Sequence, residues 1–412
     1  RARLLDEQGK IESVFSNYTH MSFNLGPTLL AWMKESAPTV YASIIDSDRA
    51  STKRFEGHGS AMAQGFNHTI LPLCNDRDRT TQVIWGVRDF EARFGRPPEG
   101  MWMPETAADT PTLEALASAG ILFTVLAPRQ CAAVRNIGDE HWNQIGEGVD
   151  PTRAYLCKLP SGRTISLFFY DGPVSQAVAF EGLLNSGDRF ADRLLSGLSD
   201  ARTHDQLMHI ATDGESYGHH HRYGEMALAA ALNRIDKDPT VEIINYGLFL
   251  KRHPPTMEAR IHENSSWSCV HGVERWRSDC GCNSGHAGMH QRWRAPLRAA
   301  FDWLRDAVTP RFEEVGATLF KDPWAARNAY IAVILDRSPA SIDRFLSEHA
   351  TRPLTDAQRT QALQLMELQR HAMLMYTSCA WFFDDVAGIE TVQVIQYAAR
   401  VVQLASTTLG LD

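Results

Sequence analysis

The chain of 412 residues contains no uninterrupted apolar run of the roughly 18–20 residues that a membrane-spanning helix requires. Its first residues, from Arg1 to Asp6, also lack the apolar core of a secretory signal peptide. These two absences argue against a membrane partner and against export. We therefore expect a protein that works in the cytoplasm.

Surplus positive charge and paired cysteines are absent as well. The 41 Lys and Arg residues are outnumbered by 49 Asp and Glu residues, which gives a formal net charge of -8. A chain without surplus cations is a poor ligand for phosphates, so we expect no nucleic-acid partner. The seven cysteines are odd in number and scattered, which is not the pattern of a disulfide framework and fits a reducing compartment.

What the sequence does contain is the pattern of a globular protein with two parts. Its hydrophobic content of 44% is ordinary. A chain longer than about 250–300 residues usually forms more than one core. Residues 1–285 alternate strand-like and helix-like segments, whereas residues 286–412 have the pattern of helices. We therefore expect an α/β domain over 1–285 and a helical domain over 286–412.

The strands of the first part are predicted from short apolar runs. Residues 121–126 are apolar throughout, which is typical of a strand buried on both faces. A turn at residues 160–163 between two strand-like segments predicts a hairpin. Further strands are expected at 206–212 and 241–246. This alternation favours a parallel sheet, open or closed into a barrel, with functional residues where the strands end.

Helices are expected where apolar residues recur with a spacing near 3.6 between capping and breaking residues. Thr110 is the predicted N-cap of one helix that ends at Gly120. The other helices of the first part are predicted at 27–33, 40–55 and 78–94. Those of the last part are predicted at 293–308, 323–335, 356–383 and 389–404.

The first candidate for chemistry is Glu105, which ends the segment GMWMPE at residues 100–105. A strand that ends at a proline and an acid would place the carboxylate at the carboxyl edge of a sheet, where barrel active sites lie. Taken alone, Glu105 is equally compatible with a solvated loop. Trp102, in the same segment, has the pattern of a core residue more than that of a ligand platform.

The second candidate is Asp213, which follows the apolar run at 206–212 and precedes a glycine turn and the histidines at 219–221. Asp-Gly is a common turn pair, so Asp213 alone is weak evidence. The density of titratable groups after a buried segment is a stronger signal. Adjacent histidines rarely converge on one metal ion, and hydrogen bonding to hydroxyl groups or to a carboxylate explains them equally well.

Two further segments carry polar groups. Residues 57–68 are rich in small residues, and Gln64, Asn67 and His68 can donate and accept hydrogen bonds. They form either a buried polar network or ligand contacts. Residues 266–282 contain four zinc-type donors, but their C-x-C pair is tighter than the usual zinc spacing. We therefore prefer a tryptophan-rich wall and assign no metal ligand; the four donors are Cys269, His271, Cys280 and Cys282.

The segments MWMPETAAD around Glu105 and TDGESYGHHH around Asp213 resemble the nucleophile and acid/base motifs of glycoside hydrolase family 57. FNHTILPL at residues 66–73 is similar to a third motif of that family. The segments CVHGVERWRSDCGC and LMYTSCAWFFDD are similar to a bacterial branch that carries an additional domain of unknown function. The resemblance covers most of the chain. The family's first motif, a His-Gln-Pro-like segment, is absent.

The resemblance implies a distorted seven-stranded (β/α) barrel, with the helical domain packed against the barrel mouth. Because the family's first motif is absent, the first strand of the barrel is the one that this chain can lack. The resemblance also implies a retaining glycoside hydrolase or 4-α-glucanotransferase acting on α-glucans or maltooligosaccharides without a cofactor. Glu105 would be the nucleophile and Asp213 the general acid/base. The expected substrate-binding residues are His58, Gln64, His68, Trp102, Tyr217, His219, His220, Trp267, Trp276 and Asp384.

The retaining mechanism and the composition of residues 381–385 each give a geometric expectation. Retaining enzymes hold their two carboxyl groups about 5–5.5 Å apart, so Glu105 and Asp213 should face each other. The run 381–385 combines three aromatic residues with two acids, which cannot all be buried on one helix face. We expect it to close one side of the barrel mouth, with packing between domains as the alternative.

Two other functions are compatible with the sequence. A metal-dependent polysaccharide deacetylase would need an ion held by Asp213 with His219 or His221. A non-catalytic glucan-binding protein would keep these acids without turnover. The sequence does not indicate an oligomeric state.

Overall fold

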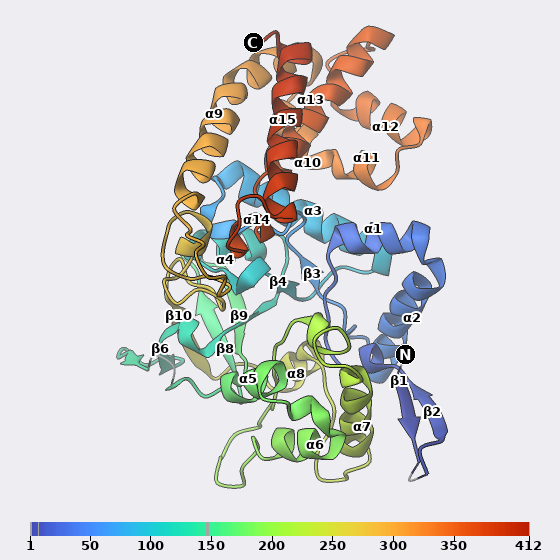
Figure 1. Ribbon diagram of the computed structural model, residues 1–412, viewed down its shortest axis with the longest axis vertical. Coiled ribbons are helices and arrows are strands. Elements are labelled where there is room, and N and C mark those ends of the chain that lie inside the picture. The colour runs from blue at the N-terminus through green and yellow to red at the C-terminus, as the bar shows by residue number, and fades with distance from the viewer. Residues whose placement is uncertain (1, 7, 146–147, 412) are drawn as a thin grey trace.

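The computed structural model describes residues 2–6, 8–145 and 148–411 of the chain. Figure 1 shows a sheet region in the middle of the molecule, with the helices α9 to α15 at one end and the helices α5 to α8 at the other. None of the helices in this described part has the length and apolar character needed to cross a bilayer.

Ten strands are assigned in the described residues. Six of them form one sheet in the order β5-β9-β8-β10-β6-β7, and the pairs β1-β2 and β3-β4 form two smaller sheets. The bounds are β1 Ala2–Leu5, β2 Ile11–Phe15, β3 Ala63–Gln64, β4 Met101–Trp102, β5 Phe123–Leu126, β6 Cys131–Asn136, β7 Asn143–Gln144, β8 Ala154–Lys158, β9 Thr164–Phe169 and β10 Met257–Ile261.

A series of parallel pairings leads from Phe23 to β9. Phe23 bridges Ala61, β3 pairs with β4, Gly100 bridges Phe123, and β5 pairs with β9, all in parallel. The remaining pairings of the large sheet include three antiparallel ones, β8-β9, β10-β6 and β6-β7, so the sheet as a whole is mixed. The predicted hairpin is confirmed, with Cys157 opposite Ile165. The seven-stranded barrel is not confirmed: the shown sheet is six-stranded and mixed.

Two predicted strands are wrong. Residues 206–212 and 241–245 run without assigned strand structure, and Tyr246 already begins a helix. The first segment still lies against the sheet region, because the Leu207 amide donates to the Thr152 carbonyl and the Asp171 amide donates to the His209 carbonyl. Apolar composition therefore identified a segment that lies against the sheet, although its backbone bonds are too irregular for a strand.

The four helices predicted in the first part are confirmed except at one cap, whereas α5 to α8 were not predicted. Gly95 ends α3 with φ of 70°, in the left-handed region that glycine reaches without steric cost. Asp109, not Thr110, caps α4, because its carboxylate accepts the Thr112 amide. The bounds are α1 Pro27–Ser36, α2 Pro38–Arg54, α3 Asp76–Phe94, α4 Thr110–Ser118, α5 Gly172–Phe180, α6 Gly187–Leu195, α7 Gly224–Asp236 and α8 Tyr246–Arg252.

The last part of the chain is helical as predicted, but two long predicted helices are each divided in two. Tyr330 separates α10 from α11, and residues 375–378 separate α13 from α14. The bounds are α9 Arg294–Leu319, α10 Pro323–Ala329, α11 Ile331–Leu335, α12 Pro339–His349, α13 Asp356–Leu374, α14 Cys379–Phe382 and α15 Ile389–Leu409.

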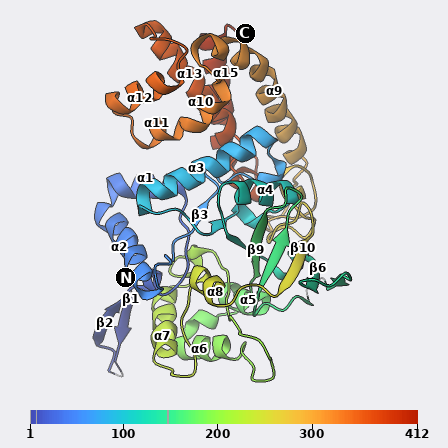
Figure 2. The ribbon, with the colours of Figure 1, turned by 180° about the vertical axis from the view of Figure 1, so that it is seen from behind.

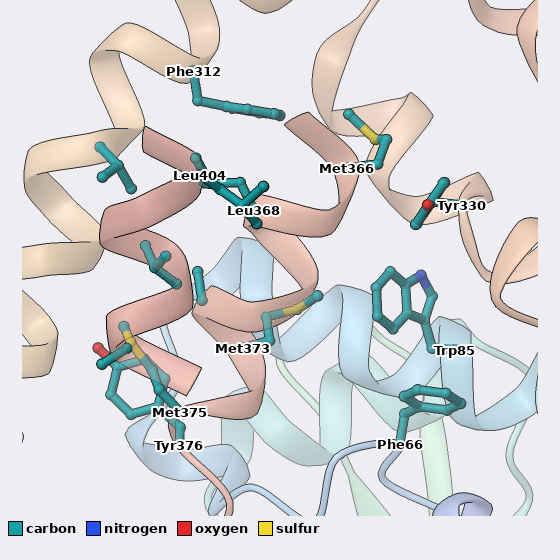
Figure 3. Packing of buried hydrophobic residues seen from close by; sticks show 14 of the residues in the cluster. Phe66, Trp85, Phe312, Tyr330, Met366, Leu368, Met373, Met375, Tyr376 and Leu404 are labelled. Atoms are coloured by element: carbon teal, nitrogen blue, oxygen red, sulfur yellow. The ribbon is translucent and has the colours of Figure 1, made fainter. Parts of the chain in front are cut away.

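The two parts share one hydrophobic core. Phe66 and Trp85 belong to the same cluster of buried residues as the inner faces of α9, α13 and α15. Figure 3 shows Trp85 of α3 and Phe66 below it facing Met373 and Tyr330 of the helical part. Seen from behind in Figure 2, α3 lies under the helices α10 to α13. The helical part is thus packed on the sheet part over α3.

Polar groups fix this packing. Arg327 of α10 is 2% exposed and forms a 2.6 Å ion pair with Asp78 of α3. Its other terminal nitrogen donates to the Thr81 hydroxyl at 2.8 Å. The Trp85 indole donates to the Asn328 carbonyl at 3.0 Å. Because buried charges are stable only when paired, these contacts define one orientation of the two parts.

Candidate active site

The carboxyl ends of the parallel segments bring candidate residues to one edge. Glu105 follows β4, Arg129 follows β5, and Tyr170 follows β9. His68 follows β3 after a short loop. Since parallel strands point their carboxyl ends in the same direction, these side chains start from the same edge of the sheet region.

The backbone at Glu105 is held in an unusual conformation. Glu105 and Thr106 have φ of 58° and 49°, and a β-branched residue such as Thr106 rarely occupies this left-handed region. Each such residue costs about 1–3 kcal/mol and persists only where surrounding contacts hold it. Here the Gln130 side chain bonds both the hydroxyl and the carbonyl of Thr106 at 2.8 Å. The Trp267 amide also donates to the Glu105 carbonyl at 3.1 Å.

The Glu105 carboxylate accepts two hydrogen bonds from one loop. The Trp267 indole donates to its Oε2 at 2.9 Å, and the Ser268 hydroxyl donates to the same oxygen at 2.5 Å. No described donor is bonded to Oε1. The two contacts fix the direction of the Glu105 side chain.

Asp213 has a different environment. The side chain is reached by solvent, but the surrounding protein removes part of its hydration, and this desolvation raises the pKa of Asp213 above its ordinary value. The negative charge of Glu105 raises this pKa further, and Glu215 acts in the same direction, while His220 opposes them. The two candidate carboxyl groups are therefore close enough to interact electrostatically.

Three aromatic rings pack together beside Glu105. Trp267 packs edge-to-face against Trp102, with ring centroids 5.1 Å apart, and against Tyr170 at 6.3 Å. Arg129 donates to the backbone carbonyl of Trp267. Burial raises the pKa of Tyr170 to about 12, an effect that Arg129 opposes and Asp213 reinforces. Tyr170 therefore stays protonated and presents a neutral phenol beside Asp213.

The helical part contributes to the same cluster. His68 Nδ1 lies 2.7 Å from the Ser378 hydroxyl, and the Ser378 amide donates to the His68 carbonyl at 2.9 Å. Burial lowers the pKa of His68, although the charge of Glu105 acts in the opposite direction. Burial also raises the pKa of Cys379, and Glu105 adds to that rise. His68 and Cys379 thus both lie within the field of Glu105.

Two predicted ligand residues lie in other surroundings. His58 precedes β3 and bonds Glu99, which precedes β4, with Nδ1 2.7 Å from the carboxylate. His58 therefore lies at the amino edge, opposite to Glu105. The Gln64 side chain accepts a hydrogen bond from Asn24 at 2.5 Å and is 8% exposed as a residue. It forms part of a buried polar network, which was the alternative interpretation of its segment.

The residues after Asp213 are brought near it by a compact turn. The Thr212 hydroxyl donates to the Tyr217 hydroxyl at 3.0 Å. His219 and His220 are exposed, and their rings lie 5.1 Å apart. His221 instead bonds the Ala179 carbonyl through Nε2 at 2.8 Å. Among the described residues, Asp213 and these histidines do not gather donor atoms as a deacetylase ion site requires.

Two predicted substrate contacts are wrong because the side chains are inside the protein. Trp276 is 0% exposed and belongs to the core shared with the helical part. Asp384 is 2% exposed, and its carboxylate accepts the amides of Ser284 at 2.7 Å and His286 at 3.1 Å. Neither side chain can meet a substrate in this conformation. The Asp384 carboxylate instead holds residues 284 and 286, and the expectation that residues 381–385 close one side of the barrel mouth stays a prediction.

The structure adds residues that were not singled out from the sequence. Ser268 bonds the Glu105 carboxylate, and the charges of Asp213 and Glu105 act on Tyr170 and Cys379 respectively. Arg129 bonds the Trp267 carbonyl, and Ser378 bonds His68. The position of Tyr170 at the end of a buried strand was a usable signal. The structure also gathers Cys269, His271, Cys280 and Cys282, which the sequence left as an alternative to a stiffened wall.

Two models of known protein families match different parts of the chain. Residues 4–262 match Glycosyl hydrolase family 57, and residues 289–412 match a domain of unknown function, DUF3536. Alpha-amylase 1 of Dictyoglomus thermophilum is 22% identical over 194 residues, which are 46% of this chain and 24% of that protein. The chain thus aligns with about a quarter of the length of this relative.

Solved structures share the fold at low sequence identity. The exo-type maltose-forming amylase of Pyrococcus sp. ST04 has a TM-score of 0.74 at 16% identity, over 95% of this chain and 69% of that chain. The GH57-type branching enzyme of Pyrococcus horikoshii has a TM-score of 0.56 at 16% identity, over 91% and 67%. The 4-alpha-glucanotransferase of Thermococcus litoralis has a TM-score of 0.55 at 16% identity, over 95% and 54%.

The family match covers more than half of the sequence and includes both candidate acids. The solved structures agree with it in fold over nearly the whole chain. On these findings, the chain belongs to glycosyl hydrolase family 57.

Proposed function

We propose that this protein is a retaining glycoside hydrolase or 4-α-glucanotransferase that acts on α-glucans, with Glu105 as nucleophile and Asp213 as general acid/base. The observation that carries the proposal is the contrast between two interacting carboxyl groups. The Glu105 carboxylate accepts two hydrogen bonds that fix its direction, whereas desolvation and the charge of Glu105 raise the pKa of Asp213. A carboxyl group with a raised pKa beside a second carboxylate that is held in place by hydrogen bonds is the arrangement expected of a general acid and a nucleophile.

The proposed chemistry has two steps. Protonated Asp213 donates its proton to the glycosidic oxygen while the free Oε1 of Glu105 attacks the anomeric carbon, which gives a glycosyl-enzyme and releases the leaving sugar. Asp213, now ionised, then removes a proton from water or from an acceptor sugar, which attacks the anomeric carbon and frees Glu105. Water gives hydrolysis, and a sugar hydroxyl gives transfer.

The residues around the acids suit a sugar substrate. Trp102, Trp267 and Tyr217 offer partly exposed rings that can pack against sugar faces. His68 has a lowered pKa and is neutral at neutral pH, so it can exchange hydrogen bonds with hydroxyl groups without adding charge beside Glu105. We propose His219 and His220, which follow Asp213 and are exposed, as further contacts to the substrate.

Product sizes test the proposed activity directly. Untagged protein is incubated with a maltooligosaccharide of single length and, separately, with amylose, and the products are separated over time. Hydrolysis yields only shorter chains, whereas transfer yields shorter and longer chains together. Glu105→Gln should abolish both patterns. Glu314→Gln, at an exposed glutamate of α9, serves as the matched control and should leave them unchanged.

Two results would contradict the proposal. The first is the absence of turnover with every α-glucan by a protein that is folded, which would favour a glucan-binding protein. The second is turnover by Glu105→Gln at the rate of the unaltered protein, which would remove Glu105 from the reaction.

A further inference from the structure

Four donor side chains converge beside the loop that holds Glu105. Cys269 follows Ser268 directly, His271 lies two residues further, and Cys280 and Cys282 follow a short helical turn. The Cys269 sulfur lies 3.9 Å from that of Cys280 and 3.7 Å from that of Cys282. The Cys282 sulfur lies 3.5 Å from Nδ1 of His271. All four donor atoms lie within 4.8 Å of one another.

These separations match one particular geometry. A tetrahedral zinc ion binds sulfur at about 2.3 Å and imidazole nitrogen at about 2.0–2.1 Å, so two sulfur ligands lie about 3.8 Å apart and a sulfur and a nitrogen about 3.6 Å apart. The three observed separations of 3.9, 3.7 and 3.5 Å are close to these values. Disulfide-bonded sulfurs would instead lie about 2.05 Å apart.

We propose that Cys269, His271, Cys280 and Cys282 bind one zinc ion. Three thiolates and one imidazole fill all four positions of a tetrahedral ion, which is the mark of a structural site rather than a catalytic one. The C-x-C pair is tighter than the usual spacing between zinc ligands in sequence. Here the glycine between Cys280 and Cys282, Gly281, has φ of 87°, which lets the chain turn sharply so that both sulfurs point inward.

The charges around the cluster support bound thiolates. Arg275 and Arg294 are 6% and 0% exposed, and their described hydrogen bonds go to backbone carbonyls and not to carboxylates. A buried guanidinium without an anionic partner is costly. Three thiolates around a divalent cation carry a net charge of -1, and Arg294 donates to the Cys282 carbonyl at 2.8 Å. The charge of the buried Asp384 already acts on Arg294, and the proposed centre supplies further negative charge beside both arginines.

The position of the site gives the ion a role. Trp267 and Ser268, which bond the Glu105 carboxylate, precede Cys269 in the chain. Arg294, which bonds Cys282, begins α9 of the helical part. A zinc ion would thus tie the loop that orients Glu105 to the start of the helical part. This role concerns the position of the loop and leaves the ion outside the reaction.

Metal analysis tests the proposal. Untagged protein is purified under reducing conditions without chelator, and its zinc content is measured by mass spectrometry. We expect about one ion per chain. Protein refolded with cobalt should show the thiolate-to-cobalt charge-transfer absorption and the intense visible bands of a tetrahedral site. Cys280→Ser and Cys282→Ser should weaken zinc retention against a chelator, whereas Cys74→Ser, at a cysteine outside the cluster, should not.

The proposal fails if the unaltered protein holds no stoichiometric zinc, both as purified and after incubation with zinc, or if cobalt gives the spectrum of an octahedral site. It also fails if Cys74→Ser lowers zinc retention as much as Cys282→Ser does. Because the cobalt spectrum is recorded on the unaltered chain, a variant that does not fold leaves the test intact. The result is independent of glucan turnover, so it separates this proposal from the proposed function.

Discussion

Asp213 carries a carboxyl group whose charged form is disfavoured at its position. Desolvation and the charge of Glu105 raise its pKa, so the proton is retained to higher pH than on an ordinary aspartate. A general acid must be protonated, and we therefore predict that kcat/KM falls as pH rises through this raised pKa. This fall is the basic limb of the pH profile.

The pH profile of Asp213→Asn checks this assignment. On a substrate with an activated leaving group, the variant should keep its first step and lose the basic limb. The variant should unfold at no lower temperature than the parent at neutral pH, because it removes a charge that is unfavourable when folded. A basic limb that persists in Asp213→Asn would assign that limb to another group.

Trp267 is predicted to position Glu105. Trp267→Phe keeps a ring beside Trp102 but removes the indole donor to the carboxylate. We expect kcat to fall by up to about a hundredfold, since a displacement near 1 Å in a reacting group costs about that much. Trp303→Phe, at an indole that is 71% exposed, is the matched control for steady-state kinetics. Equal kcat in the two variants would show that the indole donor does not matter.

Among single residues, the sequence indicated the two acids, whose roles stay proposals, but not the residues that bond them. Glu105 and Asp213 lie in recognisable motifs at the ends of apolar segments. Ser268, in contrast, lies 163 positions from Glu105 in the sequence, and Ser378 lies 310 positions from His68. Only tertiary contacts bring these serines to the cluster. Trp276 was expected in the site because its ring could pack against a sugar, yet it lies in the core shared with the helical part.

Among the elements, the segment before α9 depends on one buried carboxylate. Burial alone would raise the pKa of Asp384, but the amides of Ser284 and His286 stabilise its charge and hold the pKa below the ordinary value. Its contribution to stability is therefore present above the pKa of an unfolded aspartate and is lost as pH falls through the lowered pKa. We predict that Asp384→Asn lowers the free energy of unfolding by about 1–3 kcal/mol at pH 7.

Denaturant unfolding at neutral and acidic pH checks this. The difference between Asp384→Asn and the parent should shrink as the pH is lowered. The neighbouring Asp385 is exposed, and Asp385→Asn should stay within about 0.5 kcal/mol of the parent. A deficit of Asp384→Asn that grows toward acid would contradict the proposed role of the charged form.

The sequence predicted most helices and misjudged two strands for a physical reason. Capping and breaking residues are local signals, so α1, α3 and α15 begin or end close to the predicted residues. Strand assignment depends on partners elsewhere in the chain. Residues 206–212 are apolar and lie against the sheet, but their amides pair with scattered groups such as the Thr152 carbonyl rather than with one regular neighbour.

For the whole molecule, the shared core predicts cooperative unfolding of the sheet part and the helical part. Arg327 and Asp78 form a buried pair across the interface, and removing one partner leaves the other charge unpaired. We predict that Asp78→Asn lowers the free energy of unfolding by about 3–5 kcal/mol.

Near-ultraviolet and far-ultraviolet circular dichroism should report one coincident transition in the parent chain. Two separate transitions would show that the parts unfold independently.

The interface between the sheet part and the helical part could not be predicted from the sequence. The change from alternating segments to helices indicated two parts, and the proposed boundary near 285 stays a prediction. Which surfaces meet is decided by side-chain shape and by pairs such as Arg327 with Asp78, which are 249 positions apart. No local pattern in α3 distinguishes Trp85, which joins the shared core, from a residue buried within its own domain.

Chemical rescue by azide tests the central claim, the two carboxylate roles, most directly. Each variant is incubated with an α-glucosyl substrate that carries an activated leaving group, and the configuration of any glycosyl azide is determined by proton NMR. We predict that Asp213→Asn, which retains the nucleophile, forms the azide with retained α configuration. Glu105→Ala, which cannot form a glycosyl-enzyme, should give the inverted β-glycosyl azide. The reverse pattern, or unchanged turnover of glucans by both variants, would contradict the account.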